Sequence, residues 1–268
     1  MNIMEEYLNK YDNLKKIIVY NFELGSGGIG DCVKYFVYLL NLCMKNDIKL
    51  YYLIHNLPIE KYLKLKHEKM YITKEKVNTH NISYVSHPNQ IPYINESIYY
   101  IINPQLFYDC FSYHEIKIPL QEIFYFSEEI VVNSNKFLNN ETPYISIHLR
   151  LGDKYLETDK AFVLCKEDTR SYSETKLFEF IEKNVDKTIL FFCDNYRYKL
   201  KIKEKYHHIL ITDYEIGHTS LSNTTPIQVL NSLTDFYLLS NSQQIFIASH
   251  SGFSVMASKF KNIPLNEI

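Results

Sequence analysis

The sequence predicts an α/β protein with parallel sheets that carry helices on both faces. Strand-like runs rich in Ile, Val, Tyr and Phe alternate with amphipathic helical patterns along the chain of 268 residues. Most of these runs are continuously apolar rather than alternating, which sheets buried on both faces require. Strand-helix-strand units of this kind connect by right-handed crossovers.

The strand-like runs are placed by their composition and by the polar residues that bound them. They cover residues 15–22, 49–55, 97–102, 144–150, 188–194, 208–213 and 244–249. Several of them end in a polar or charged residue, which places chemistry at the carboxyl edge of each predicted sheet.

Helices are predicted between these runs. In residues 31–47, apolar side chains fall at helical spacing and form one stripe: Val33, Phe36, Val37, Leu40 and Met44. Further helices are predicted over Pro119–Leu138 and Ser173–Val185, and over Thr225–Ser242, where Pro226 suits the first turn.

The polar segment NNETP, after the helix predicted to end at Leu138, is the best candidate for a domain boundary. The chain is therefore divided into two Rossmann-like halves, residues 1–140 and 141–268. Because no glycine/serine linker or low-complexity block separates them, the halves are expected to be closely joined.

Composition excludes several classes of function. The formal charge of −2 creates no field that would attract nucleic acid or an anionic membrane. The charged N-terminus and the lack of a long apolar run predict a cytoplasmic protein with no membrane segment. The five cysteines lack metal-type spacing, so no metal site is expected. Scarce Gly and Pro beside abundant Ile, Lys, Asn and Tyr are typical of an AT-rich genome, such as that of a low-GC microbe or a large DNA virus.

A glycine loop follows the first strand, with Gly25, Gly27 and Gly30 at the spacing of a dinucleotide fingerprint. The second strand ends at His55 and Asn56, however, where that fingerprint requires an acidic residue. Asp31 would also place negative charge beside a pyrophosphate. The loop is therefore either a strand-to-helix turn without a ligand or the lining of a cleft, in which Gly28 and Gly30 bring backbone close to a substrate.

Candidate phosphate ligands lie in the second half. His148 and Arg150 end a strand two residues apart and leave it on the same face, and Arg150 suits a clamp on phosphate. An arginine in an ion pair between the halves is the alternative. The run from Ser249 to Gly252 leads into a helix whose first turn provides free N–H groups, so it is a candidate anion site.

Three ordered motifs resemble those of the fucosyltransferase superfamily, which includes the α1,2-, α1,6- and protein-O-fucosyltransferases and the nodulation fucosyltransferase. They are H-x-R-x-G-D-K at His148–Lys154, F-x-x-D at Phe191–Asp194, and D-x-x-x-L-S followed by S-x-S-G-F-S at Asp235–Ser254. In the first half, GSGGIGD is similar to the superfamily's opening glycine turn. Leu151 stands where many relatives have a second arginine.

The resemblance implies a GT-B fold, in which two Rossmann-like domains face each other across a cleft. It also implies an inverting transferase that uses GDP-fucose without a metal and acts on a glycan, glycolipid or protein. By this resemblance Arg150 grips the diphosphate, His148 and Asp235 bind the guanine nucleoside, and Asp194 lies near the ribose or its supporting loop. The phosphate pocket is completed by Ser249, Ser251, Gly252 and Phe253.

On the acceptor side, Lys154 matches a lysine of the α1,6 enzymes, and Glu157 matches a glutamate with a shift of one residue. The acceptor hydroxyl needs a base, for which Glu157 and Asp31 are the candidates. Asp31 has a competing role in favourable contact with the helix dipole. Two other hypotheses stay open: a GT-B enzyme with another donor, similar to the heptosyltransferases, and a nucleotide-binding protein without activity.

Overall fold

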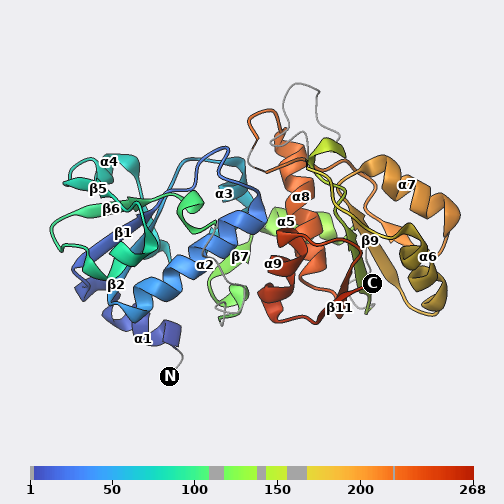
Figure 1. The fold of residues 1–268 in the computed structure, drawn as a ribbon, viewed down its shortest axis with the longest axis horizontal. Coiled ribbons are helices and arrows are strands. Elements are labelled where there is room, and N and C mark those ends of the chain that lie inside the picture. The colour runs from blue at the N-terminus through green and yellow to red at the C-terminus, as the bar shows by residue number, and fades with distance from the viewer. Residues whose placement is uncertain (1–2, 109–117, 138–142, 156–167, 220) are drawn as a thin grey trace.

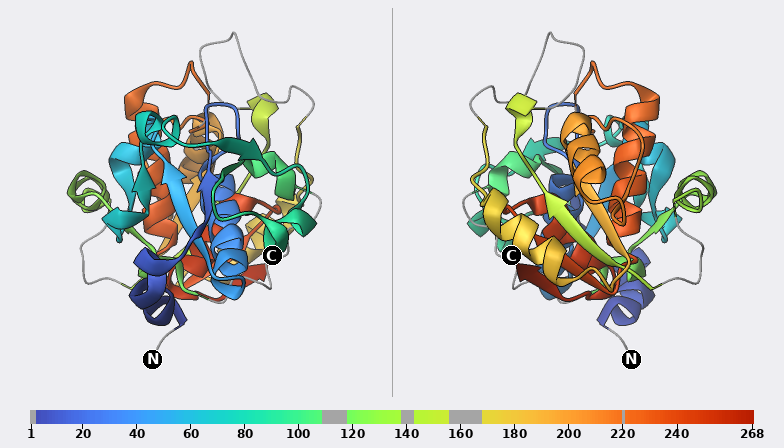
Figure 2. Two further views of the ribbon diagram at one scale, coloured as in Figure 1. Left: turned by 90° about the vertical axis from the view of Figure 1, so that its left-hand side faces the viewer. Right: turned by 90° about the vertical axis from the view of Figure 1, so that its right-hand side faces the viewer.

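The computed structural model describes residues 3–108, 118–137, 143–155, 168–219 and 221–268. Two parallel five-stranded sheets lie toward opposite ends of the long axis, and α2, α5, α8 and α9 lie between them (Figure 1). Viewed along that axis, the two halves lie one behind the other (Figure 2). We call residues 3–137 the first half and residues 143–268 the second half.

Each sheet has its first strand at the centre. The first has the order β4-β2-β1-β6-β5, and the second the order β10-β9-β8-β11-β12. The first comprises β1 (Lys16–Tyr20), β2 (Ile48–Leu53), β4 (Tyr71–Ile72), β5 (Ile82–Tyr84) and β6 (Tyr99–Ile102). The second comprises β8 (Ile145–Leu149), β9 (Ile189–Cys193), β10 (Leu210–Ile211), β11 (Gln244–Ile247) and β12 (Leu265–Glu267). Every strand-like run of the sequence contributes a strand, so the prediction of parallel α/β architecture is confirmed.

The helices connect the strands and cover the sheets. They are α1 (Ile3–Lys10), α2 (Ile29–Lys45), α3 (Pro58–Tyr62), α4 (Lys74–Val77), α5 (Glu128–Ser134), α6 (Glu174–Lys183), α7 (Tyr196–Lys205), α8 (Pro226–Leu239) and α9 (Gly252–Lys261). Short 3₁₀ helices are Tyr11–Asn13, Glu68–Met70, Pro88–Tyr93, Pro104–Phe107, Leu120–Glu122 and Asp153–Tyr155. α8 begins where predicted because Thr225 and Gln228 form a capping box around Pro226.

The single helix predicted over Pro119–Leu138 is wrong. The segment contains a 3₁₀ turn, the strand β7 (Phe124–Phe126) and then α5. β7 pairs antiparallel with β3 (Leu63–Leu65), so a partner distant in the sequence overrides the local helical pattern. Leu138 and the predicted boundary at residue 140 lie outside the described residues.

One apolar core joins the two halves. It runs from α2 and the first sheet through β7 to α8 and α9 of the second half. The Phe126 ring lies 4.8 Å from that of Phe260 and 5.1 Å from that of Tyr237. A second core lies between the other face of β8 and β9 and helices α6 and α7. Because side chains of both halves share the first core, the halves are held in a fixed relation that shapes the site between them.

Candidate active site

A cavity of about 450 Å³ lies between the halves, at the carboxyl ends of β8 and β9. Ligands of open α/β sheets bind at this edge. The predicted site residues that line it are Gly28, Gly30, Asp31, His148, Arg150, Asp194, Asp235, Ser251, Gly252 and Phe253. Residues far apart in the sequence, from both halves, therefore meet at one place.

The N-termini of two helices meet at this cavity. Gly28 is the N-cap of α2, and Ser251 is the N-cap of α9 and accepts a hydrogen bond from the Phe253 N–H at 3.3 Å. A Cβ on Gly30 would lie 2.9 Å from the Gly252 carbonyl carbon, which is too close for any side chain. The last glycine of the loop is thus required for contact between the halves. Both helix dipoles present their positive ends to the cavity.

Asp31 lies in the first turn of α2 and caps that helix. Its Oδ2 accepts the Gly28 N–H at 3.1 Å, and its Oδ1 lies 2.5 Å from the Lys34 ammonium. Gly27 has φ +121°, and a Cβ there would overlap the Asp31 side chain. The helix-capping role is therefore present, and the carboxylate also faces the cavity.

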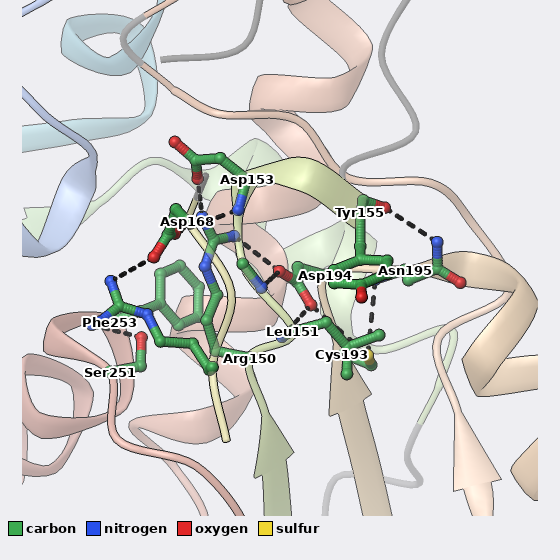
Figure 3. Close-up of polar contacts among 12 residues, drawn as sticks. Arg150, Leu151, Asp153, Tyr155, Asp168, Cys193, Asp194, Asn195, Ser251 and Phe253 are labelled. Carbon is green, nitrogen blue, oxygen red and sulfur yellow. Dashed lines mark hydrogen bonds and ion pairs between the residues drawn. The ribbon is translucent and has the colours of Figure 1, made fainter. Parts of the chain in front are cut away.

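Arg150 lies among three carboxylates (Figure 3). Its Nη2 contacts Asp153, its Nη1 lies 3.0 Å from Asp194 Oδ2, and Asp168 is 4.0 Å away. Asp168 also pairs with Arg170 at 3.1 Å. Among the described residues, the carboxylates that pair with Arg150 all belong to the second half, so the ionic network seen there lies within that half and not between the halves.

Asp194 anchors the loop that follows β8. Its two oxygens accept the N–H groups of Leu151 at 2.8 Å and Gly152 at 2.9 Å. The side chain is only 2% exposed, so these bonds and the Arg150 pair are made away from water. Gly152 has φ +114°, and a Cβ there would overlap the Asp168 carbonyl. Asp194 thus fixes the backbone that carries Arg150.

Two buried polar atoms at the cavity lack a partner among the described residues: His148 Nδ1 and Asp235 Oδ2. His148 stacks on Phe253, with ring centroids 5.5 Å apart. Burial and the neighbouring Arg150 charge lower the pKa of His148 to about 3, so the imidazole is neutral at pH 7. Burial raises the pKa of Asp235, against the opposing charge of Lys199. Such atoms point to a polar ligand.

Two of the predicted site residues, Ser249 and Lys154, lie outside the cavity lining. Ser249 is not among the residues that line the cavity; its Oγ accepts the Arg150 N–H at 2.8 Å and donates to the Arg150 carbonyl at 2.7 Å. This ties the end of β11 to the end of β8. Lys154 is also not among the lining residues, and its ammonium lies 6.0 Å above the Tyr155 ring. Glu157 lies outside the described residues.

The sequence interpretation missed part of the lining. The loop Ile216–Thr219 enters the cavity because helix α8 holds it: Asn231 donates to the Glu215 carbonyl at 2.9 Å, and Ser232 accepts the Gly217 N–H at 3.1 Å. No sequence motif indicated His218. Burial lowers the pKa of this histidine, and the negative charge of Asp153 partly opposes that effect. Asp153, in contrast, belongs to the H-x-R-x-G-D-K motif and was open to prediction.

Paired Rossmann-like sheets with a ligand cavity between them define the GT-B class of fold. Several solved structures to which this chain is similar are fucosyltransferases. The NodZ α-1,6-fucosyltransferase soaked with GDP-fucose has a TM-score of 0.59 and 12% identity, over 92% of this chain and 93% of that one. A mutant of FUT1 of Arabidopsis thaliana in complex with GDP has a TM-score of 0.58 and 10% sequence identity, over 98% of this chain and 73% of that one. POFUT1 in complex with GDP has a TM-score of 0.57 and 10% sequence identity, over 95% of this chain and 98% of that one.

The predicted GT-B fold and the resemblance to fucosyltransferase structures are thus confirmed at the level of the fold. No protein-family model matches the sequence, and no curated protein matches it by sequence. Within the described residues, no helix is long and apolar enough to cross a bilayer. Over the same residues, no three His, Cys, Asp or Glu side chains are grouped to hold a metal ion.

Proposed function

We propose that this protein is a glycosyltransferase that transfers fucose from GDP-fucose, with inversion and without a metal ion, to a glycan, glycolipid or protein. The observation that carries the proposal is the pair of unpartnered atoms, His148 Nδ1 and Asp235 Oδ2. They line the same cavity as Arg150 and the N-terminus of α9. We assign His148 and Asp235 to a base end of this cavity, and Arg150 with the N-terminus of α9 to a phosphate end.

At the base end, Asp235 Oδ2 accepts the neighbouring N1–H and N2–H donors of guanine. A carboxylate oxygen has lone pairs for both, and leaving it unpaired in a buried place is costly, by about 1–3 kcal/mol or more. The neutral His148 ring contributes a nitrogen to the nucleoside. Adenine presents a lone pair at N1, which a carboxylate repels.

At the phosphate end, Arg150, the Ser251 hydroxyl and the N–H groups that begin α9 bind the diphosphate. These groups also stabilise the charge that develops on GDP as the sugar leaves, which is the main demand of the reaction. Phosphate oxygens replace Asp153 as partners of the Arg150 fork. Gly28 and Gly30 place the first turn of α2 beside the same groups.

The proton of the acceptor hydroxyl goes to a carboxylate. Asp31 faces the cavity from the first half, and release from Lys34 would make it available as the base. Glu157 is the second candidate, and Lys154 belongs to the acceptor side of the proposal. Because Asp31 also caps α2, its substitution tests two roles at once, and Asp31→Asn keeps the shape of the cap.

The test is thermal stabilisation by GDP, GDP-fucose, GDP-mannose, UDP, ADP and NAD. A ligand at 100 times its Kd stabilises the native state by about 2.7 kcal/mol, which raises the melting midpoint by roughly 5–10 °C for a chain of this size. We expect a shift with guanine nucleotides alone, and its loss in Arg150→Ala. A shift with UDP or ADP but not GDP would refute the assigned donor.

Activity needs a separate readout. Release of GDP from GDP-fucose, in the presence of a chelator and a panel of glycans, measures turnover and metal dependence together. We expect release that is stimulated by one acceptor class and abolished in Arg150→Ala. Tight GDP binding with no release from any acceptor would identify a nucleotide-binding protein on the same fold.

A further inference from the structure

A buried lysine lies behind the base end of the cavity. Lys199, on α7, is fully buried, and its ammonium donates to Thr212 Oγ1 at 2.9 Å and to the Tyr214 carbonyl at 2.8 Å. The same ammonium lies 5.0 Å above the centre of the Tyr214 ring. Burying a charge is costly unless it is paired, so a fully buried lysine at this place calls for a reason.

Tyr214 connects this lysine to Asp235. Its hydroxyl donates to Asp235 Oδ1 at 2.7 Å, and its ring packs edge-on against Phe137 at 5.2 Å. One carboxyl oxygen is therefore held by Tyr214, while the other, Oδ2, has no partner among the described residues and belongs to a cavity-lining side chain. Tyr214, which Lys199 holds through its carbonyl, thus orients the Asp235 carboxylate.

The charge of Lys199 acts on the same carboxyl. Asp235 is 1% exposed, and burial raises its pKa, which favours the neutral, protonated carboxyl. The Lys199 ammonium from α7 and the hydroxyls of Tyr214 and Thr212, which follow β10, all favour the charged form. His148 is neutral across the working pH range and contributes no charge.

We propose that Lys199 is a positioning residue that keeps Asp235 ionised and oriented, and so makes the cavity select a base with adjacent N–H donors. The inference rests on the proposed function, because it assigns the base end to guanine. An ionised Oδ2 accepts from N1–H and N2–H, whereas a protonated carboxyl would turn a donor toward them. The residue that decides base selection thus lies behind the site and touches no ligand.

The experiment measures the Kd of GDP, inosine diphosphate and ADP by calorimetry at several pH values, in the native sequence and in Lys199→Met. Lys201→Met is the matched control, since Lys201 lies on the same helix, is 55% exposed and pairs with Glu174. Each variant is compared with the native protein at the same pH, so titration of the diphosphate cancels. Circular dichroism establishes that each variant is folded.

In Lys199→Met, the pKa of Asp235 rises, so the loss of GDP affinity is largest at low pH and shrinks as the pH increases. Each unit of pKa shift changes the ionised fraction up to about tenfold below the new pKa, so we expect the loss of GDP affinity relative to the native protein to be larger near pH 6 than near pH 8.5. Discrimination between GDP and ADP falls in parallel. Lys201→Met leaves both quantities unchanged, and Lys199→Arg, which keeps the positive charge, restores the pH dependence of the native protein.

An equal loss for all three nucleotides at every pH would mean that Lys199 has only a structural role, and unchanged GDP affinity would also overturn the inference. If Lys199→Met does not fold, Tyr214→Phe provides the test: it removes the donor to Oδ1 and predicts the same direction of pH dependence. A native protein that fails to bind GDP would instead refute the proposed function.

Discussion

Replacing Asp194 by Asn tests whether this carboxylate holds the arginine loop. The substitution keeps the size of the side chain but replaces one oxygen with an amide NH₂ and removes the charge. Both native oxygens are in use, by the N–H groups of Leu151 and Gly152 and by Arg150 at 3.0 Å. At least one backbone N–H must then face another donor, and Arg150 loses an ionic partner.

The cost follows from these contacts. A hydrogen bond to a charged group contributes about 1.5–3 kcal/mol, and removing one partner of a buried ion pair costs about 3–5 kcal/mol. With the Asp194 side chain 2% exposed, solvent screening is weak. These effects overlap, so we expect a loss of about 3–5 kcal/mol in the free energy of unfolding, which lowers the melting midpoint by roughly 6–20 °C.

Thermal and urea unfolding measure this loss, and calorimetry at a temperature where the variant is folded measures GDP binding. We expect weaker binding as well, because the backbone that carries Arg150 is released. Asp213→Asn is the control, since that side chain is exposed beyond β10 and should change stability by less than about 0.5 kcal/mol. A loss below about 1 kcal/mol in Asp194→Asn would refute the anchoring role.

Three further predictions concern the contacts around the cavity. Gly30→Ala should push the first turns of α2 and α9 apart, at a cost of about 1–3 kcal/mol in the free energy of unfolding, and should weaken GDP binding measured by calorimetry. Gly28→Ala is the control, because a Cβ on Gly28 would lie at an ordinary 3.6 Å from His218 Nε2. Equal GDP affinities in the two variants would contradict this reasoning. Ser249→Ala removes the tie between β11 and β8 and should cost about 1–3 kcal/mol in urea unfolding, and no loss would exclude a role for the tie. Because burial raises the pKa of the Cys32 and Cys43 thiols, thiolate is scarce at mildly alkaline pH; a thiol-specific disulfide reagent should label them only after unfolding, and rapid native labelling of either would contradict their burial.

The strands were predictable because their signal is local. In β9, successive side chains enter opposite cores: Phe192 packs in the core shared by the halves, and Phe191 packs against α6 and α7. A strand buried on both faces must be continuously apolar, and that pattern is visible in the sequence alone. The segment Phe124–Phe126 carries a similar run, yet its helical context and its distant partner β3 hid it.

The residues of the site were predictable where they end parallel strands. The carboxyl ends of β8 and β9 meet at one edge, so Arg150 and Asp194 had to lie close together. His218 and Asp168 come from loops, whose paths depend on anchors such as the bond from Asn231 to the Glu215 carbonyl. Nothing local in the sequence encodes such a path, so these residues were missed.

The glycine loop shows how one motif can answer two demands. Its spacing matches a dinucleotide fingerprint, but Gly27 is required by its positive φ beside Asp31 and Gly30 by its contact with Gly252. Gly27 is required for the turn and Gly30 for the contact between helices α2 and α9, and neither requirement involves a pyrophosphate bound at α2. The loop is accordingly explained by the architecture of the cleft, with the acid at its end facing the cavity from the first half.

The charges around the cavity bear on how a donor would enter it. The cations Arg150, Arg170 and Lys34 are each paired with an aspartate. A diphosphate must therefore exchange partners with these carboxylates rather than meet bare positive charge. This exchange of ion-pair partners weakens the nonspecific attraction of anions, because a lone phosphate gains little from replacing a carboxylate. Under the proposed function, a ligand that also fills the base end would gain hydrogen bonds to His148 and Asp235 in addition. Under the proposed function, selectivity for a whole nucleotide would arise from this pairing, and inorganic phosphate should compete poorly with GDP.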